Sequence, residues 1–248
     1  MTTIEDNLQQ VRGRIATACA RADRDVTAVT LLAVSKTFGP DAVVQALAAG
    51  QRAFGENYIQ EGVEKILALR ETRPDAVIEW HCIGPVQSNK TRLVAAHFDW
   101  VQSVDRLKIA QRLSEQRPAG MAPLQVCLQV NVDGGPTKSG VAPAELPALA
   151  EAVASLPQLR LRGLMCIPEP AAGFEAQRAV FLRARALFDA LNARGFGLDP
   201  LSMGMSSDLD AAIASGSTLV RVGSAIFGAR TYPARCRLPS ICSATPAV

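Results

Sequence analysis

Lys36 is the residue whose type and position most directly suggest covalent chemistry. It follows the apolar run Leu31–Val34, within the segment AVSKT. At the end of a buried strand an amine is partly desolvated, which lowers its pKa and leaves some of it neutral at pH 7. A neutral amine can add to an aldehyde and form a Schiff base. A lysine that only packs its stem against the rim of a sheet is the alternative, and position alone does not separate the two.

A second group of residues suits a phosphate. The segment SMGMSSD at 202–208 runs from a strand into a helix, where unpaired N–H groups and hydroxyls can bind an anion or simply cap the helix. The next strand is followed by a Gly-Ser pair at the start of a short helical turn. Two neighbouring signals of this kind favour a phosphate site. Its predicted residues are Ser206, Ser207, Gly223 and Ser224.

Arg221 interrupts an apolar strand. It alternates with Val220 and Val222, and an unpaired buried charge is costly. A carboxylate such as Asp208 is one possible partner. The other is the pyridine nitrogen of pyridoxal 5'-phosphate (PLP), a cofactor commonly held by a Lys Schiff base with an Asp or Arg near its ring nitrogen.

Two further loops carry polar residues after strands. Asn57, in FGENY, could contact a ligand or cap the next helix, and His81, in WHCIGPVQSNK, could lie at the site or be a satisfied core residue. The segment GGPTKSG at 134–140 resembles a phosphate-binding loop. However, Thr137 stands before Lys138 where that motif needs glycine. We expect a flexible loop over the mouth of the fold.

The elements that must position these residues alternate regularly. Short apolar runs are separated by longer amphipathic stretches, which predicts eight βα units preceded by a helix at about Glu5–Ala22. The predicted strands are Val26–Val34, Arg52–Phe54, Glu79–Ile83, Trp100–Val104, Leu124–Asn131, Leu159–Ile167, Leu201–Met203 and Thr218–Val222. Helices are predicted at Asp41–Ala49, Ile59–Leu69, Lys90–Ala95, Arg106–Gln116, Ala144–Ser155, Phe174–Ala193 and Asp208–Ala214.

Such a series can close into a barrel or form an open sheet. The first strand is not followed by GxGxxG, which argues against a dinucleotide-binding sheet. We therefore predict an α/β fold, a single (β/α)8 TIM-type barrel with an extra N-terminal helix, spanning residues 1–232. Such barrels place their functional groups at the carboxyl ends of the strands. Residues 233–248 lack periodicity, so we expect a mobile tail.

Composition excludes several classes of function. The net charge is only +3 over 248 residues, and basic residues are mixed with acids, which argues against nucleic acid as a partner. The six cysteines contain no CxxC pair, and four of them have apolar surroundings that favour buried, reduced thiols. With only two histidines and no clustered cysteine ligands, we do not expect a metal site. With no signal peptide and no apolar run long enough to cross a bilayer, we expect a cytoplasmic protein without membrane contact, and a monomer.

Several motifs together resemble the pyridoxal-phosphate homeostasis protein family (YggS/PROSC type). They are AVSKT, FGENYIQE at 54–61, WHCIGPVQSNK at 80–90, KSG at 138–140, RGLMCI at 162–167, SMGMSSD at 202–208 and GSTLVRVGSAIFGAR at 216–230. The resemblance extends over nearly the whole chain to about Tyr232. It departs only at Cys82 and Val86, where the family has other apolar residues.

The resemblance implies a barrel like the N-terminal domain of alanine racemase. It also implies that PLP is held as an aldimine on Lys36, with its phosphate at Ser206, Ser207, Gly223 and Ser224. Arg221 then lies beside the pyridine nitrogen, Asn57 in the pocket and His81 nearby. Members of this family are thought to buffer PLP, to supply it to PLP-dependent apoenzymes, and to influence amino-acid and keto-acid balance.

Three functions remain open at this point. The first is a non-catalytic PLP carrier, with no catalytic residue assigned. An amino-acid racemase or decarboxylase is the second, but racemisation needs a second acid or base on the far face of the cofactor. The candidates in this chain are His81, Tyr58 and Cys166. The third, a sugar-phosphate aldolase that uses Lys36 as its Schiff-base lysine, shares the predicted fold but not the motifs. We expect the carrier.

Overall fold

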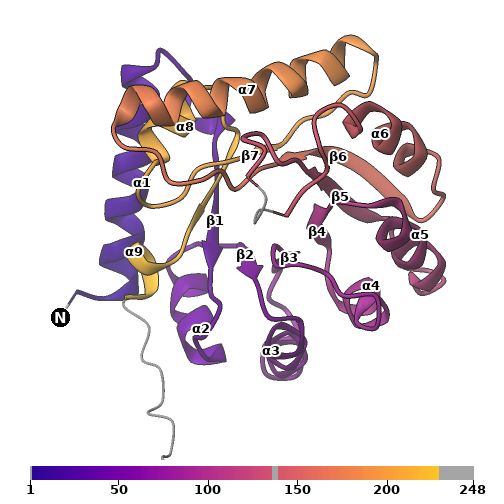
Figure 1. Cartoon of the computed structure of the whole chain (residues 1–248). Coiled ribbons are helices and arrows are strands. Elements are labelled where there is room, and N and C mark those ends of the chain that lie inside the picture. The colour runs from indigo at the N-terminus through magenta and orange to yellow at the C-terminus, as the bar shows by residue number, and fades with distance from the viewer. Residues whose placement is uncertain (1, 136–138, 229–248) are drawn as a thin grey trace, which may run out of the picture.

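Eight parallel strands close into a barrel in the order β1 to β8 (Figure 1). The computed structural model describes residues 2–135 and 139–228. The strands are β1 Thr30–Val34, β2 Ala53–Glu56, β3 Glu79–Cys82, β4 Trp100–Val104, β5 Leu124–Gln129, β6 Leu159–Met165, β7 Leu201–Ser202 and β8 Leu219–Val222. Pairing of β1 with β8 completes the ring, with Leu32 opposite Arg221. The predicted (β/α)8 barrel is confirmed.

Helices surround the strands on the outside (Figure 1). They are α1 Ile4–Arg21, α2 Pro40–Ala48, α3 Ile59–Thr72, α4 Thr91–His97, α5 Leu107–Gln116, α6 Leu146–Ala154, α7 Phe174–Ala193, α8 Leu209–Ala214 and α9 Ser224–Phe227. The predicted N-terminal helix is α1, which begins at a capping box formed by Thr3 and Asp6. It packs beside α8 and α9, and Asn7 Nδ2 donates a hydrogen bond to the carbonyl oxygen of Ile226 at 2.9 Å.

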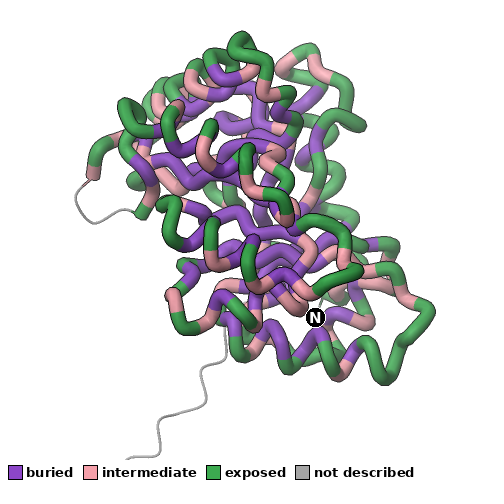
Figure 2. The backbone as a smooth tube through the Cα atoms, turned by 90° about the vertical axis from the view of Figure 1, so that its right-hand side faces the viewer, coloured by how far each residue is buried: buried purple, intermediate pink, exposed green. Residues whose placement is uncertain are grey.

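Most residues of the strands are buried, and Figure 2 shows buried backbone running through the interior of the molecule. On β1, Ala33 belongs to the large apolar cluster beneath the helices. Its neighbours Leu32 and Val34 instead pack with Ile83 and Leu219 in a smaller cluster on the opposite face of the sheet. Polar side chains share this interior, and they connect to the site described below.

One predicted strand begins too early. Val26–Ala28 form a 3-10 turn, because the side chain of Asp25 accepts a hydrogen bond from the N–H of Thr27. Val26 is accordingly exposed, and β1 begins at Thr30. The predicted tail at 233–248 and the loop residue Lys138 lie outside the described residues.

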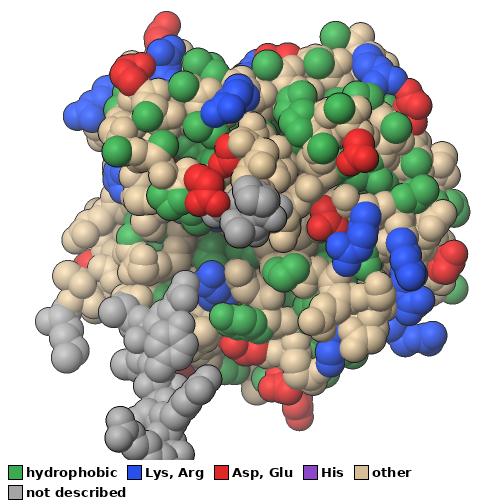
Figure 3. Space-filling model, viewed as in Figure 1, with side chains coloured by type: hydrophobic (Ala, Val, Ile, Leu, Met, Phe, Trp, Pro, Cys, Tyr) green, Lys and Arg blue, Asp and Glu red, His purple; other side chains and the backbone are tan. Residues whose placement is uncertain are grey.

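Basic and acidic side chains are intermingled on the face of the molecule shown in Figure 3. Among the described residues, none of the helices is both long and apolar enough to span a bilayer.

Candidate functional site

A cavity of about 340 Å³ lies at the carboxyl ends of the strands. Seven of the eight residues predicted to bind the cofactor line it: Lys36, Asn57, Ser206, Ser207, Arg221, Gly223 and Ser224. Apolar side chains complete the wall: Val34, Phe38, Ile83, Ile167 and Met205. An apolar cavity of this size with a few converging polar groups is typical of a small-molecule site.

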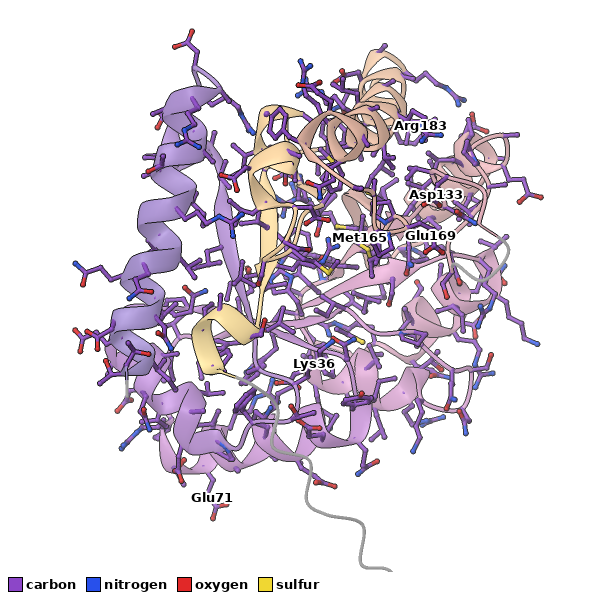
Figure 4. The ribbon with its side chains drawn as sticks, turned by 60° about the vertical axis from the view of Figure 1, so that its left-hand side comes forward. Lys36, Glu71, Asp133, Met165, Glu169 and Arg183 are labelled. Carbon is purple, nitrogen blue, oxygen red and sulfur yellow. The ribbon has the colours of Figure 1, made fainter. Side chains whose placement is uncertain are left out.

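Lys36 reaches the cavity because β1 ends two residues before it. The N–H of Ser35 donates a hydrogen bond to the carbonyl of Gly55 on β2, which continues the sheet up to the lysine. Thr37 then has a φ of 68°, in the left-handed region, so the backbone turns sharply just after Lys36. Figure 4 shows Lys36 close to α9 and toward the middle of the molecule, in contrast to Glu71 and Arg183 on the outside.

The residues predicted to bind a phosphate come from two loops that line the cavity, the one before α8 and the one after β8. Gly223 lies so close to β1 that an added Cβ would stand 3.1 Å from the carbonyl oxygen of Val34. Because α8 and α9 have only six and four residues, hydroxyls and backbone N–H groups matter more here than a helix dipole. Arg14 on α1 donates a hydrogen bond from Nη1 to the carbonyl of Ser206 at 2.5 Å, which holds the Ser206–Ser207 loop in place.

Arg221 is 4% exposed and donates three hydrogen bonds within the barrel. Nη1 donates to the carbonyl oxygen of Ser202 at 2.8 Å and to its Oγ at 2.7 Å, and Nη2 donates to the carbonyl of Cys166 at 2.8 Å. A guanidinium has five N–H donors, so two remain without an acceptor among the described residues. Burial lowers the pKa of Arg221, since desolvation disfavours its charge.

Asp208, the carboxylate suggested as a partner for Arg221, makes no hydrogen bond to it. Its Oδ1 instead accepts the N–H of Met205 at 2.6 Å and closes the turn at the start of α8. Its charge acts on Arg221 only at longer range. Neutral oxygens therefore hold the buried guanidinium, and Arg221 lines the cavity with two N–H groups that have no acceptor among the described residues.

His81 does not line the cavity, although we predicted it as a cofactor-binding residue. It is 1% exposed and its ring stacks on Trp100, with centroids 5.2 Å apart. Both of its nitrogens are engaged: Nε2 lies 2.7 Å from Glu79 Oε1, and Nδ1 lies 2.9 Å from Gln102 Nε2. These bonds hold the ring of His81 in the barrel interior, behind the cavity lining. Its direct contact with a cofactor therefore stays a prediction.

His81 is instead connected to Arg221 by an interior relay, formed by Arg221, Ser202, Gln102, His81 and Glu79. Ser202 Oγ accepts from Arg221 and donates to Gln102 Oε1 at 2.7 Å. The Gln102 amide nitrogen must then donate to His81 Nδ1, which leaves the ring proton on Nε2 for the carboxylate of Glu79. All donors therefore point the same way, from the cavity to the half-exposed Glu79 at the start of β3.

Asn57 presents an acceptor at the cavity. Its Oδ1 is buried and has no hydrogen-bond partner among the described residues. The position of Asn57 depends on Gly84, where an added Cβ would stand 2.1 Å from the carbonyl oxygen of Asn57. An unpaired buried polar atom in a ligand cavity suits a bound donor group.

The residues proposed as a second acid lie away from the cavity lining. Cys166 is fully buried, and burial raises the pKa of its thiol to about 12. Burial also raises the pKa of the Cys82 thiol and of the Cys127 thiol to about 12. Tyr58 is 52% exposed and does not contact the cavity. The expectation of buried reduced thiols is confirmed for the four cysteines that the structure describes, and Cys236 and Cys242 lie outside those residues.

Sequence reasoning missed the polar residues behind the cavity. Gln102 and Ser202 are buried on strands, and Glu56 and Lys65 form a buried ion pair beside Lys36. A signal was present for Lys65, because it lies between Ile59 and Leu69 on the helix face that packs on the barrel. A charged residue at such a position needs a partner of opposite charge.

Comparison with known proteins shows which families and structures this chain is similar to. Residues 6–231 match the family model of the alanine racemase N-terminal domain. A pyridoxal phosphate homeostasis protein of Pseudomonas aeruginosa is 61% identical over 234 residues, covering 94% of this chain and 99% of the relative. One from Escherichia coli is 53% identical over 232 residues, covering 94% and 99%. PipY of Synechococcus elongatus, solved with PLP bound, superposes with a TM-score of 0.78 at 36% identity, covering 91% of this chain and all of PipY.

Proposed function

The chain belongs to the pyridoxal phosphate homeostasis protein family, and we propose that it binds PLP covalently through Lys36 and acts in PLP homeostasis in the cytoplasm. One observation carries this proposal. A lysine, three serine hydroxyls and a buried arginine converge on one cavity of about 340 Å³. That set matches the aldehyde, the phosphate and the ring nitrogen of PLP.

Each group has a distinct task in this proposal. Lys36 supplies the amine that captures the aldehyde. Ser206, Ser207 and the backbone at Gly223 bind the phosphate dianion through charge-assisted hydrogen bonds. Arg221 directs its two remaining N–H groups toward the ring nitrogen. PLP bound there supplies a reactive aldehyde and an electron-withdrawing ring.

The carrier role is favoured over a racemase or decarboxylase by the cavity wall. Of its lining residues, only Lys36 and Arg221 carry a titratable side chain within the described part of the chain. An arginine can donate but not accept a hydrogen bond, so it disfavours protonation of the ring nitrogen and weakens the electron sink. The lysine side of the cavity has a base, and the opposite side lacks a matching acid among these residues.

Borohydride reduction of the protein with PLP tests the covalent site. We expect the reduced pyridoxyl group on the peptide that contains Lys36. Labelling mainly at Lys65, Lys90, Lys108 or Lys138 would refute the assignment. Lys36→Ala should lose the visible absorption band of the covalent complex while keeping phosphate-driven binding.

The phosphate and the carrier role have their own measurements. Pyridoxal without its phosphate should bind more weakly by a few kcal/mol, because two or three charge-assisted bonds are lost. Equal affinity for both forms would move the phosphate site elsewhere. Turnover of common L- or D-amino acids should be negligible, and a rate of roughly 1 s⁻¹ or more would make the protein an enzyme.

A further inference from the structure

A buried ionic cluster contacts both residues that flank Lys36. On the preceding side, Lys65 Nζ donates to the carbonyl oxygen of Ser35 at 2.9 Å and to Glu56 Oε1 at 2.6 Å. Ser35 Oγ donates to the same oxygen of Glu56, also at 2.6 Å. The backbone carbonyl and the hydroxyl of Ser35 are thus bound to the two members of one ion pair.

On the following side, Glu61 binds the backbone of Thr37. Its Oε1 accepts the N–H of Thr37 at 2.6 Å and lies 3.4 Å from Lys65 Nζ. Glu61 and Lys65 are one turn apart on α3, and Glu56 ends β2. We call Glu56, Lys65 and Glu61 the anchoring cluster.

Burial of the charges of the anchoring cluster costs free energy of desolvation. Lys65 is 3% exposed and Glu56 is fully buried, and Glu56 Oε2 has no hydrogen-bond partner among the described residues. Desolvation raises the pKa of Glu56 even though Lys65 acts against the shift. Buried ion pairs are often no more stabilising than apolar side chains of similar volume. Stability alone therefore does not account for this one.

The backbone that the anchoring cluster holds is strained. Thr37 is a β-branched residue with a φ of 68°, a conformation that such residues rarely adopt. Strain of this kind persists where surrounding contacts over-determine it, and it gathers at functional sites. Here the contacts are those of Glu61 with Thr37 and of Lys65 with Ser35, one on each side of Lys36.

We infer that the anchoring cluster is the positioning unit of Lys36, fixing the backbone on both sides so that the amine meets the PLP aldehyde in a reactive geometry. The inference rests on the proposed function. Neither carboxylate lines the cavity, so the cluster acts through the backbone of residues 35–37 and not on the ligand. A displacement of about 1 Å at a reacting group can slow a reaction roughly 100-fold.

Glu61→Ala tests this inference, with Glu64→Ala as its matched control. Glu64 is an exposed glutamate on the same helix, whose side chain is bonded only to Gln60 among the described residues. Two quantities are measured: the rate at which Lys36 captures PLP, followed by absorbance, and the affinity for pyridoxine 5'-phosphate, which has no aldehyde. In Glu61→Ala we expect capture about 10- to 100-fold slower, with affinity for the aldehyde-free analogue changed less than about twofold. Glu64→Ala should match the wild type in both.

A second variant keeps the test decisive if the first unfolds. Glu56→Gln with Lys65→Met replaces the buried ion pair by neutral side chains of similar length. It should fold because the one carboxylate left without Lys65, Glu61, is partly exposed to solvent. It should show the same selective loss of capture rate. Capture as fast as in the Glu64→Ala control would overturn the positioning role, as would a parallel loss of analogue binding. Borohydride labelling of Lys36 in the wild type decides the proposed function separately.

Discussion

The interior relay makes a sharp prediction at Gln102. The substitution Gln102→Leu preserves much of the volume of the side chain but removes the amide that joins Ser202 to His81. Two bonds are lost, of 2.7 Å to Ser202 Oγ and 2.9 Å to His81 Nδ1. Gln102 and Ser202 are fully buried and His81 is 1% exposed, so water cannot replace the amide.

The expected cost follows from the groups left unpaired. Each buried donor or acceptor without a partner costs about 1–3 kcal/mol. Because the Ser202 hydroxyl can rotate, we expect a total loss of about 3 kcal/mol in the free energy of unfolding. For a domain of this size that corresponds to a fall of roughly 6–12 °C in Tm. Looser support of Arg221 should also weaken PLP binding, by roughly 1 kcal/mol or about fivefold.

Urea denaturation and nitrogen NMR check this prediction together. His81 and His97 are the only histidines in the sequence, so the imidazole signals are simple to assign. The wild type should show a proton on Nε2 of His81 and none on Nδ1, as the relay requires. Gln111→Leu, at an exposed position on α5, is the control and should change stability by less than about 0.5 kcal/mol.

Two results would refute the reasoning about the relay. One is a His81 ring protonated on Nδ1 in the wild type, which would reverse the direction of donation from Gln102. The other is a Gln102→Leu variant that loses less than about 1 kcal/mol, since the buried polar atoms would then have found other partners.

Two further predictions follow from close contacts and burial. Gly84→Ala should displace Asn57, because the new Cβ would stand 2.1 Å from the carbonyl oxygen of Asn57. PLP titration should therefore show weaker binding in this variant. The control is Gly39→Ala, where nothing lies within 4 Å of the added Cβ. Burial lowers the pKa of His97, so the unfolded chain binds more protons at acid pH. The contribution of neutral His97 to the free energy of unfolding is complete above a pH of about 6.5 and declines below it. Urea midpoints measured between pH 7 and 5 should therefore fall less in His97→Gln than in the wild type.

Local sequence patterns predicted the barrel because each element depends on its own residues. The strand ends that carry Lys36 and Arg221 could be located from apolar runs alone, since parallel strands of a barrel present their carboxyl ends to one face. The predicted start of the first strand at Val26 was wrong because the side chain of Asp25 accepts a hydrogen bond from the N–H of Thr27, which begins a 3-10 turn. That competition between side chain and backbone leaves no mark in the hydrophobic pattern.

The surroundings of the site were harder to predict, because they depend on pairings across the barrel. Ser202 and Gln102 are 100 residues apart, yet they share a hydrogen bond. His81 was placed near the site by its neighbours in sequence, but its ring is directed into the interior by Glu79 and Gln102. Register between distant strands decides such contacts, and one sequence does not reveal it.

The direction of the relay bears on the carrier proposal. Every bond from Arg221 to Glu79 donates away from the cavity, so neutral oxygens behind the guanidinium support it. Two of its N–H groups have no acceptor among the described residues. To accept a hydrogen bond from a protonated PLP ring nitrogen, the site would need a carboxylate at this position, and Arg221 has no acceptor atom. A carboxylate in place of Arg221 could not donate to Ser202, so the buried hydrogen bonds from Ser202 to Glu79 would have to reverse their direction. This arrangement supports the proposed carrier role, in which the ring nitrogen would stay unprotonated and the cofactor would be stored more readily than used for catalysis.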